Sequence, residues 1–214
     1  MTDGVIKYSI EHQSGNAPVF PGYEALEALR RRLYALGLIG EKEGIGYGNI
    51  SMRSGQQQSF FITATQTGNM PSLTRDHYTY INGYDFDTFK VFSKGPHQPS
   101  SEALSHAMIY EIDPRINTVI HIHSLPLWHF MIERGDLTTT ATYGTAEMTQ
   151  EIAGLYTDLD PLTHNAFVMK GHEEGIIVVG GSVEEAELRL YGIMRDYLLG
   201  VGSIQNPDPD RDLG

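Results

Sequence analysis

Residues 118–123 read Thr-Val-Ile-His-Ile-His, a β-rich run that predicts a strand and from which the rest of the fold can be laid out. Side chains two residues apart on a strand point to the same face, with their Cα atoms about 6.6 Å apart. The imidazoles of His121 and His123 can therefore reach one ion, and neutral imidazole is a good ligand for zinc and related divalent metals. The pair predicts a metal site on a strand, and the alternative is polar surface on an edge strand.

A third ligand is expected in the segment 170–175, which reads Lys-Gly-His-Glu-Glu-Gly. His172 lies there in a glycine-bounded turn between two strand-like runs, where its side chain can project into a cleft. Three histidines with an open fourth position are typical of a catalytic rather than a structural zinc site. The alternative for His172 is an exposed loop. We expect the other six histidines to be surface or structural residues: His12, His77, His97, His106, His129 and His164.

Helix and strand patterns alternate along the whole chain, without a linker or an internal repeat. Leucines at three- and four-residue steps after Pro21 predict a helix. Ser100-Ser101 offers an N-cap for a helix to about Ile112, and Ser182 with Glu185 forms a capping box for a last helix to about Leu199. Short strands between these helices favour a mixed or antiparallel sheet flanked by helices. We expect one domain over residues 1–214, with 200–214 as a mobile tail rich in Asp, Pro and Gly.

Composition excludes several classes of protein. The 214 residues include 15 Lys+Arg, 27 Asp+Glu and no Cys, for a net charge of −12. Disulfides and thiolate chemistry are therefore excluded, and the acidic balance argues against a nucleic-acid partner, which needs a basic face. No apolar run approaches the roughly 20 residues of a membrane-spanning helix, so we expect no membrane partner. Without a signal-peptide pattern, we expect a cytoplasmic protein.

Three short stretches are candidate anion cradles. Residues 46–51, Gly-Tyr-Gly-Asn-Ile-Ser, supply glycines, an amide and a hydroxyl, and residues 65–69, Thr-Gln-Thr-Gly-Asn, supply two more hydroxyls and a glycine. Ser100-Ser101 adds hydroxyls and the free N–H groups of a helix start, which favour phosphate. Each stretch alone is equally explained as a turn or a cap. Because the chain is acidic, we expect it to hold a phosphate ester with neutral donors of this kind.

Glu102 follows the two serines directly. A glutamate in the first turn of a helix ordinarily complements the helix dipole. Beside a phosphate cradle and a divalent metal, it becomes a candidate general acid/base, because burial raises and the metal lowers the pKa of such a carboxyl group.

Taken together and in order, five motifs resemble the pattern of the class II aldolase/adducin family over about Glu24 to Leu199. They are Gly48-Asn49-Ile50-Ser51, Thr67-Gly68, Pro99-Ser100-Ser101-Glu102, His121-Ile122-His123 and the later His172. The resemblance implies an α/β fold, a three-layer α/β/α sandwich with a central, mostly antiparallel sheet. It also implies a homotetramer whose active sites lie between subunits.

The resemblance further implies the role of each site residue. His121, His123 and His172 would hold Zn2+, or another divalent metal such as Mn2+, Co2+, Fe2+ or Ni2+. Glu102 would be the acid/base. The substrate phosphate would be bound by residues of the three cradles, namely Asn49, Ser51, Thr67, Gly68, Ser100 and Ser101. A divalent ion chelated by a ketone oxygen and its neighbouring hydroxyl polarises the carbonyl and stabilises an enediolate.

The function expected from this pattern is a metal-dependent, aldolase-type lyase acting on a small phosphorylated keto sugar. Alternatives are an epimerase or a dehydratase in the same fold, a non-catalytic adducin-like assembly module, and a metal hydrolase. Two stretches differ from the family pattern. The His172 motif carries Glu173 and Glu174 where the family more often has Asn-His-Gly or His-His-Gly, and the short segment 124–142 contains no tyrosine.

Overall fold

The computed structural model describes residues 6–55 and 57–204 of the chain. Its described strands form a nine-stranded sheet in the order β1-β7-β6-β5-β4-β8-β11-β10-β9, together with a separate hairpin of β2 and β3. The strands of the large sheet are β1 (Ser9–Ser14), β4 (Asn49–Arg53), β5 (Phe60–Thr63), β6 (Tyr78–Asp85), β7 (Lys90–Gly95), β8 (Thr118–His123), β9 (Thr138–Thr139), β10 (Ala166–Met169) and β11 (Gly175–Gly180). The hairpin consists of β2 (Gly40–Lys42) and β3 (Ile45–Tyr47).

The sheet is antiparallel through its centre and parallel only at its two edges among the described strands. β1 runs parallel to β7, and β9 runs parallel to β10. Strand β8, which carries the two paired histidines, lies between β4 and β11 and is antiparallel to both. All six residues of β8 are buried, because the strand has neighbours on both sides and helices over both faces.

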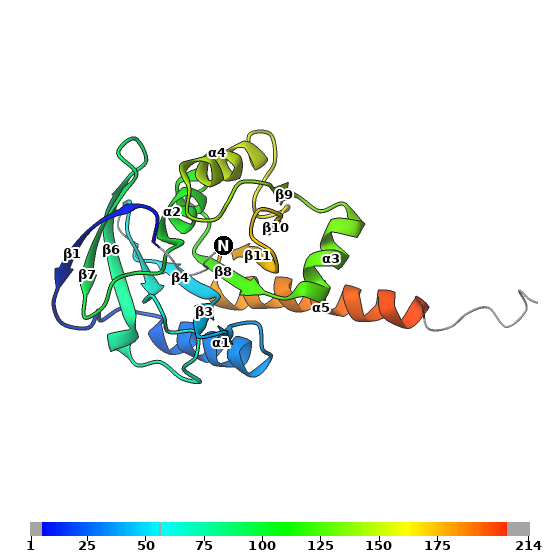
Figure 1. Cartoon of the computed structure of the whole chain (residues 1–214), viewed down its shortest axis with the longest axis horizontal. Helices are drawn as coiled ribbons and strands as arrows, with labels where there is room; N and C mark the ends of the chain where they lie inside the picture. Colours follow the sequence, from blue (N-terminus) through cyan, green and yellow to red (C-terminus); the bar gives the residue numbers. More distant parts are fainter. Residues whose placement is uncertain (1–5, 56, 205–214) are drawn as a thin grey trace, which may run out of the picture.

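Helices cover both faces of the sheet (Figure 1). One hydrophobic core joins the sheet to α1 (Tyr23–Ala35), α3 (Leu125–Arg134) and α5 (Val183–Ile204), and a second core joins it to α2 (Ala103–Ile112) and α4 (Ala146–Leu155). A short 3-10 helix, Arg75–His77, precedes β6. The prediction of a three-layer α/β/α sandwich with a mostly antiparallel sheet is confirmed.

The alternation along β8 separates the two cores. Ile120 and Ile122 pack into the core of α1, α3 and α5, whereas Val119 packs into the core of α2 and α4. Since His121 and His123 share the face of Val119, both imidazoles lie on the side of the sheet that α2 and α4 cover.

The last helix differs from the sequence prediction. The predicted helix ends at about Leu199 and a tail starts at residue 200, but α5 continues through Ile204. Gly200 is therefore part of a helix rather than of a mobile tail, and residues 205–214 of the expected tail lie outside the described part of the chain. Among the described residues, no helix combines the length and the apolar character needed to span a membrane.

Candidate functional site

The third histidine reaches the pair on β8 through the pairing of β11 with β8. Gly175, the first residue of β11, is opposite His123 in the antiparallel register, and His172 lies just before it in the loop that joins β10 to β11. Glycine is needed at position 175, because a Cβ there would lie 2.7 Å from Cδ2 of His172. The short loop and the missing side chain bring His172 beside the end of β8.

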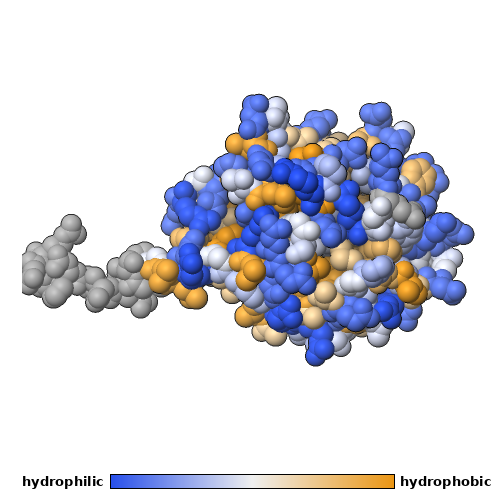
Figure 2. Space-filling model, turned by 180° about the vertical axis from the view of Figure 1, so that it is seen from behind, coloured by the Kyte–Doolittle hydropathy of each residue, from blue (hydrophilic) through white to orange (hydrophobic). Residues whose placement is uncertain are grey.

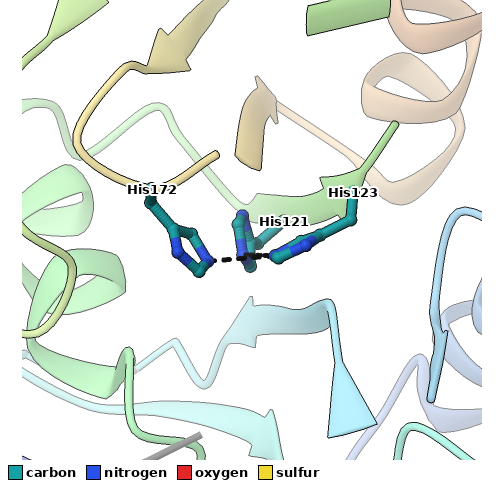
Figure 3. A group of neighbouring side chains, drawn as sticks. All are labelled: His121, His123 and His172. Carbon is teal, nitrogen blue, oxygen red and sulfur yellow. Dashed lines mark hydrogen bonds between the residues drawn. The ribbon is translucent and has the colours of Figure 1, made fainter. Parts of the chain in front are cut away.

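The three imidazoles point toward one another (Figure 3). Nε2 of His123 lies 3.1 Å from Nε2 of His121 and 3.0 Å from Nε2 of His172, and the three side chains are buried. Nitrogen ligands held tetrahedrally about 2.0–2.1 Å from zinc are about 3.3–3.4 Å from one another, only slightly farther apart than these atoms. The residues therefore fit a divalent metal ion.

A hydrogen bond and burial set the orientation and the protonation state of two of these histidines. The Nδ1 group of His121 lies 3.2 Å from the carbonyl oxygen of Ile176, which as an acceptor favours a proton on Nδ1 and leaves the Nε2 lone pair directed at the cluster. Burial, followed by the charges of His121 and His172, holds the pKa of His123 well below its usual value. His123 is therefore neutral, which is the form that binds metals.

Glu102, at the start of α2, adds a carboxylate to the three histidines. It is buried directly before α2, and its Oε2 atom lies 2.9 Å from Nε2 of His121 and accepts a 3.0 Å hydrogen bond from Nδ2 of Asn49. Its other oxygen, Oε1, lies 3.9 Å from Nε2 of His172 and has no hydrogen-bond partner among the described residues. The two oxygens thus have different surroundings: Oε2 is fixed within the site and Oε1 is open to a further group.

Opposing effects set the pKa of Glu102. Burial raises it, but the charge and hydrogen bond of His121, the charge of His172 and the hydrogen bond from Asn49 lower it below the usual range of a carboxyl group. Glu102 is consequently a carboxylate at neutral pH, and can accept a proton.

The loops predicted to bind phosphate meet at this cluster. Residues 46–49, 64–68 and 100–102 line one small pocket together with the three histidines, and we call it the inner pocket. Of the predicted site residues, the structure brings together Asn49, Thr67, Gly68, Ser100, Ser101, Glu102, His121, His123 and His172. Gly68 lies so close to the hairpin that a Cβ would be 2.1 Å from the carbonyl oxygen of Gly40. Glycine at this position allows two loops of the inner pocket to touch.

Ser51 is the one predicted site residue that does not line the inner pocket. Its side chain is fully buried under α2, where Oγ lies 2.7 Å from Nδ1 of His106 and 2.7 Å from the hydroxyl of Tyr110. The strand period places Ser51 on the same face as Asn49, but α2 covers that face one step beyond the pocket. The hydroxyl is therefore engaged in tying β4 to α2.

Two tyrosines that the sequence did not single out as site residues pack on the histidines. The ring of Tyr47 stacks on His123 with centroids 5.1 Å apart, and the ring of Tyr143 lies 4.6 Å from that of His172. Tyr143 stands one residue beyond the tyrosine-free segment 124–142 and brings an aromatic side chain to the cluster after all. The sequence signal that could have identified Tyr143 is its position in the motif Tyr143-Gly144-Thr145, directly before α4.

The two glutamates that depart from the family pattern border a second space. It is a cavity of about 630 Å³ on the other side of His123 and His172, and we call it the outer cavity. Glu174 forms a 2.9 Å ion pair with Lys42 there, and its Oε2 atom lies 3.9 Å from Nδ1 of His123. Glu173 is another of the residues that line the outer cavity. His123 and His172 therefore line both the inner pocket and a wider cavity that is bordered by charged side chains.

Comparison with known proteins agrees with this geometry. Residues 24–195 match the family model described as Class II Aldolase and Adducin N-terminal domain. No curated protein sequence gives a significant match.

Solved structures give the same fold at low sequence identity. L-fuculose-1-phosphate aldolase from Thermus thermophilus is 22% identical, with 87% of this chain and 97% of that chain aligned and a TM-score of 0.58. A sugar-phosphate aldolase from Thermotoga maritima is 18% identical over 86% of this chain and 95% of that chain, with a TM-score of 0.64. YgbL from Escherichia coli, for which aldolase, epimerase and decarboxylase activities are all considered, is 19% identical over 88% and 91%, with a TM-score of 0.64.

Proposed function

The chain belongs to the class II aldolase and adducin family, and on that premise we propose that it is a metal-dependent lyase that cleaves a small phosphorylated keto sugar. One observation carries the proposal. A buried carboxylate, Glu102, lies 2.9 Å from one histidine of a three-histidine cluster, in a pocket whose other walls are loops rich in neutral hydrogen-bond donors. Residues that would serve as metal ligands, as a proton acceptor and as hydrogen-bond donors to an anion thus share one small pocket.

The histidine cluster would hold the ion through the Nε2 atoms of His121, His123 and His172. Zinc is the metal we propose, with Mn2+, Co2+, Fe2+ and Ni2+ as alternatives, because imidazole suits all of them. When bound, such an ion supplies Lewis-acid chemistry by polarising a substrate carbonyl.

Glu102 would move the proton. Its Oε2 atom accepts a hydrogen bond from Asn49, so Oε1, which has no partner among the described residues, is the atom that would exchange a proton with the carbon next to the substrate carbonyl. Asn49 would hold the carboxylate in position for this transfer while the surrounding loops exclude water.

The phosphate would lie against the donors of the inner pocket. We assign this role to Asn49, Thr67, Gly68, Ser100 and Ser101, and not to Ser51, whose hydroxyl is buried under α2. No lysine or arginine is found among the described residues that line the inner pocket. Neutral hydroxyl, amide and main-chain N–H groups would therefore contact the phosphate directly.

The test is cleavage of a panel of ketose 1-phosphates by the zinc-loaded protein, with product analysis by NMR. We expect release of an aldehyde and dihydroxyacetone phosphate that depends on the metal. Absence of turnover across the panel, with metal bound, would reject the aldolase form of the proposal. Epimerised or dehydrated products from the same panel would instead indicate an epimerase or a dehydratase, both of which can begin from the same proton transfer.

Metal analysis separates an enzyme from an adducin-like assembly module. The retention of all three histidines and Glu102 supports the enzyme, because an assembly module has no use for a buried metal cluster beside a carboxylate. About one equivalent of divalent metal per chain after reconstitution is the result that we expect. A chain that takes up less than about a tenth of an equivalent would favour the assembly module.

The proposal includes one domain over the whole chain, a homotetramer with active sites between subunits, and a cytoplasmic location. Three leucines on α5 support an assembly: Leu188, Leu198 and Leu199 are 69%, 65% and 63% exposed. On the face seen in Figure 2, apolar residues lie scattered among hydrophilic ones. Light scattering in solution tests the tetramer, and a monomer at micromolar concentration would contradict it. Fractionation of the source cells tests the location.

A further inference from the structure

A buried arginine lies behind one of the loops that line the inner pocket. Arg30 on α1 is only 1% exposed. Its guanidinium donates hydrogen bonds to the main-chain carbonyls of Thr67 (2.8 Å), Gly68 (3.3 Å) and Met70. Arginine is almost never fully buried unless its donors are satisfied, and here those donors are satisfied by a single loop. Arg30 and loop 64–70 therefore form one structural unit.

Other residues on the same face of α1 hold this loop and the segment that follows it. Glu27, three residues before Arg30, is 8% exposed and accepts hydrogen bonds from the main-chain N–H of Leu73 (2.7 Å) and the hydroxyl of Tyr78 (2.9 Å). Tyr34, four residues after Arg30, donates a 3.4 Å hydrogen bond to the carbonyl of Asn69. Residues three and four apart share one face of a helix, so two turns of α1 contact the loop and the residues directly after it.

The loop is also confined on its other side. Gly68 packs against the hairpin of β2 and β3 so closely that a Cβ would lie 2.8 Å from Cα of Gly46. The hairpin prevents the loop from moving in that direction, and the hydrogen bonds of Arg30 prevent it from moving away from α1. The main chain at Thr67 and Gly68 is therefore fixed before any ligand binds.

The charge of Arg30 matters because the inner pocket is otherwise without a cationic side chain. Among the described residues, no lysine or arginine lines it, whereas Glu102 does. Burial lowers the pKa of the Arg30 guanidinium, but an arginine remains charged at neutral pH. Arg30 itself does not line the inner pocket, so the carbonyls of Thr67 and Gly68 bond to a group outside it. The carboxylate of Glu27, on the same face of α1, interacts with this guanidinium and offsets part of its charge. The remaining positive charge, with the polarised main chain of Thr67 and Gly68, attracts an anion in the pocket.

We propose that Arg30 is a positioning residue of the phosphate subsite, where it fixes loop 64–70 and supplies the positive charge that neutral donors lack. The inference rests on the proposed function, because it requires that the inner pocket takes a phosphate. It predicts that the affinity for phosphate depends on a residue that never touches the ligand.

The experiment compares three variants of the full-length, zinc-loaded protein with the wild type. Arg30→Met removes both the charge and the hydrogen bonds, Arg30→Lys keeps the charge without the planar fork of donors, and Arg31→Met removes a charge from the exposed neighbour as the matched control. Inorganic phosphate is titrated by calorimetry. In parallel, zinc affinity is measured by chelator competition, and folding by circular dichroism.

We expect Arg30→Met to bind phosphate about tenfold more weakly or worse, since the variant loses the hydrogen bonds from the guanidinium to the carbonyls of loop 64–70, and with them the loop geometry. Arg30→Lys should fall between Arg30→Met and the wild type. Zinc affinity should stay within about twofold of the wild type in all three variants, because the histidines belong to β8 and to the loop before β11, and Arg31→Met should bind phosphate as the wild type does.

Each other outcome has a definite meaning. If folded Arg30→Met binds phosphate as tightly as the wild type, Arg30 is not a positioning residue, and the proposed function stands. If phosphate and zinc affinity fall in parallel, the role of Arg30 is general stability, and the inference is wrong. If Arg30→Met does not fold, Arg30→Lys decides, and unchanged phosphate affinity in that variant overturns the inference. A wild type that binds zinc but no phosphate overturns both the inference and the phosphate part of the proposed function.

Discussion

Glu102 and His121 meet in the interior, with Oε2 of the carboxylate 2.9 Å from Nε2 of the imidazole. The contact joins the start of α2 to the central strand β8, and both residues line the inner pocket. Because Oε2 is also held by Asn49, the carboxylate is fixed in orientation, and Oε1 is left for proton transfer. Substitutions at Glu102 and at nearby residues test the roles that the structure suggests for them.

The first prediction concerns Glu102 itself. Glu102→Gln keeps the size of the side chain and an acceptor for Asn49 but removes the base. We expect turnover to fall by about 10²–10⁴, the usual contribution of a general acid/base, with zinc still bound at wild-type stoichiometry. The readouts are steady-state kinetics and metal analysis. Glu173→Gln in the outer cavity is the control, and equal losses in both variants would argue against a specific role for Glu102.

The second prediction concerns the metal cluster. His172→Ala removes one of three converging nitrogens, so we expect zinc affinity to fall by more than about 100-fold, beyond the effect of losing an outer-shell partner. Zinc should raise the thermal unfolding midpoint of the wild type, because an ion that binds only the folded state stabilises it, and it should leave His172→Ala unchanged. His129→Ala, at an exposed position on α3, serves as the control. A zinc-induced shift in His172→Ala as large as that of the wild type would refute the assignment of this ligand.

The third prediction separates Ser51 from the phosphate ligands. Ser51→Ala leaves His106 and Tyr110 without their shared hydroxyl partner in the interior, so we expect the free energy of unfolding to fall by about 1–3 kcal/mol. Phosphate affinity should be unchanged. Urea denaturation and phosphate titration measure the two effects, with exposed Ser14→Ala as the control. A loss of phosphate affinity without a loss of stability would show that Ser51 does contact the phosphate.

The fourth prediction is a pH dependence of stability that arises from His106. Burial, with smaller opposing effects of the charges of Glu102 and His121, lowers the pKa of His106 to about 3. In the unfolded chain its pKa is about 6.5. Between these values the unfolded state binds a proton that the folded state does not, so stability is complete above about pH 6.5 and is lost as the pH falls below it.

Urea unfolding of the metal-free protein between pH 5 and 8 measures this dependence. One such histidine contributes up to about 1.4 kcal/mol per pH unit below pH 6.5. His106→Gln should reduce the slope by about that amount, and His97→Gln, at an exposed site, should leave it unchanged. A slope that is the same in His106→Gln and in the wild type would show that His106 does not cause it.

Local patterns predict the centre of this fold well and its edges poorly. The β-rich run over 118–123 predicts β8 with its observed bounds, because a buried central strand is determined by its own residues. Strand β1 has no such pattern, since most of its residues are exposed, and it forms by pairing with β7, far away in the chain. Helix α5 extends past the predicted end at about Leu199 to Ile204, because a glycine such as Gly200 weakens a helix without ending it.

Helix α3 could have been predicted from the sequence. Ser124 caps its N-terminus, Pro126 stands in its first turn, and Gly135 ends it in a left-handed conformation. These are the usual signals of helix ends.

The site shows the same division between local and tertiary information. The histidines and Glu102 could be named from their spacing and neighbours, because their motifs are local. Arg30 could not, since Arg30, Arg31 and Arg32 look alike in the sequence, and only the fold buries the first of them. Ser51 was expected beside Asn49 in the cradle, and sequence spacing alone does not show that α2 covers its side chain.

Solvent exchange into dihydroxyacetone phosphate tests the central claim most directly, because it requires no knowledge of the aldehyde partner. The zinc-loaded protein is incubated with this compound in D₂O. The loss of a proton from its hydroxymethyl carbon, next to the carbonyl, is followed by NMR. The account predicts stereospecific exchange of one proton, which stops when a chelator removes the metal and falls by about 10²–10⁴ in Glu102→Gln. Exchange at the uncatalysed rate by protein with a full equivalent of bound metal would contradict it.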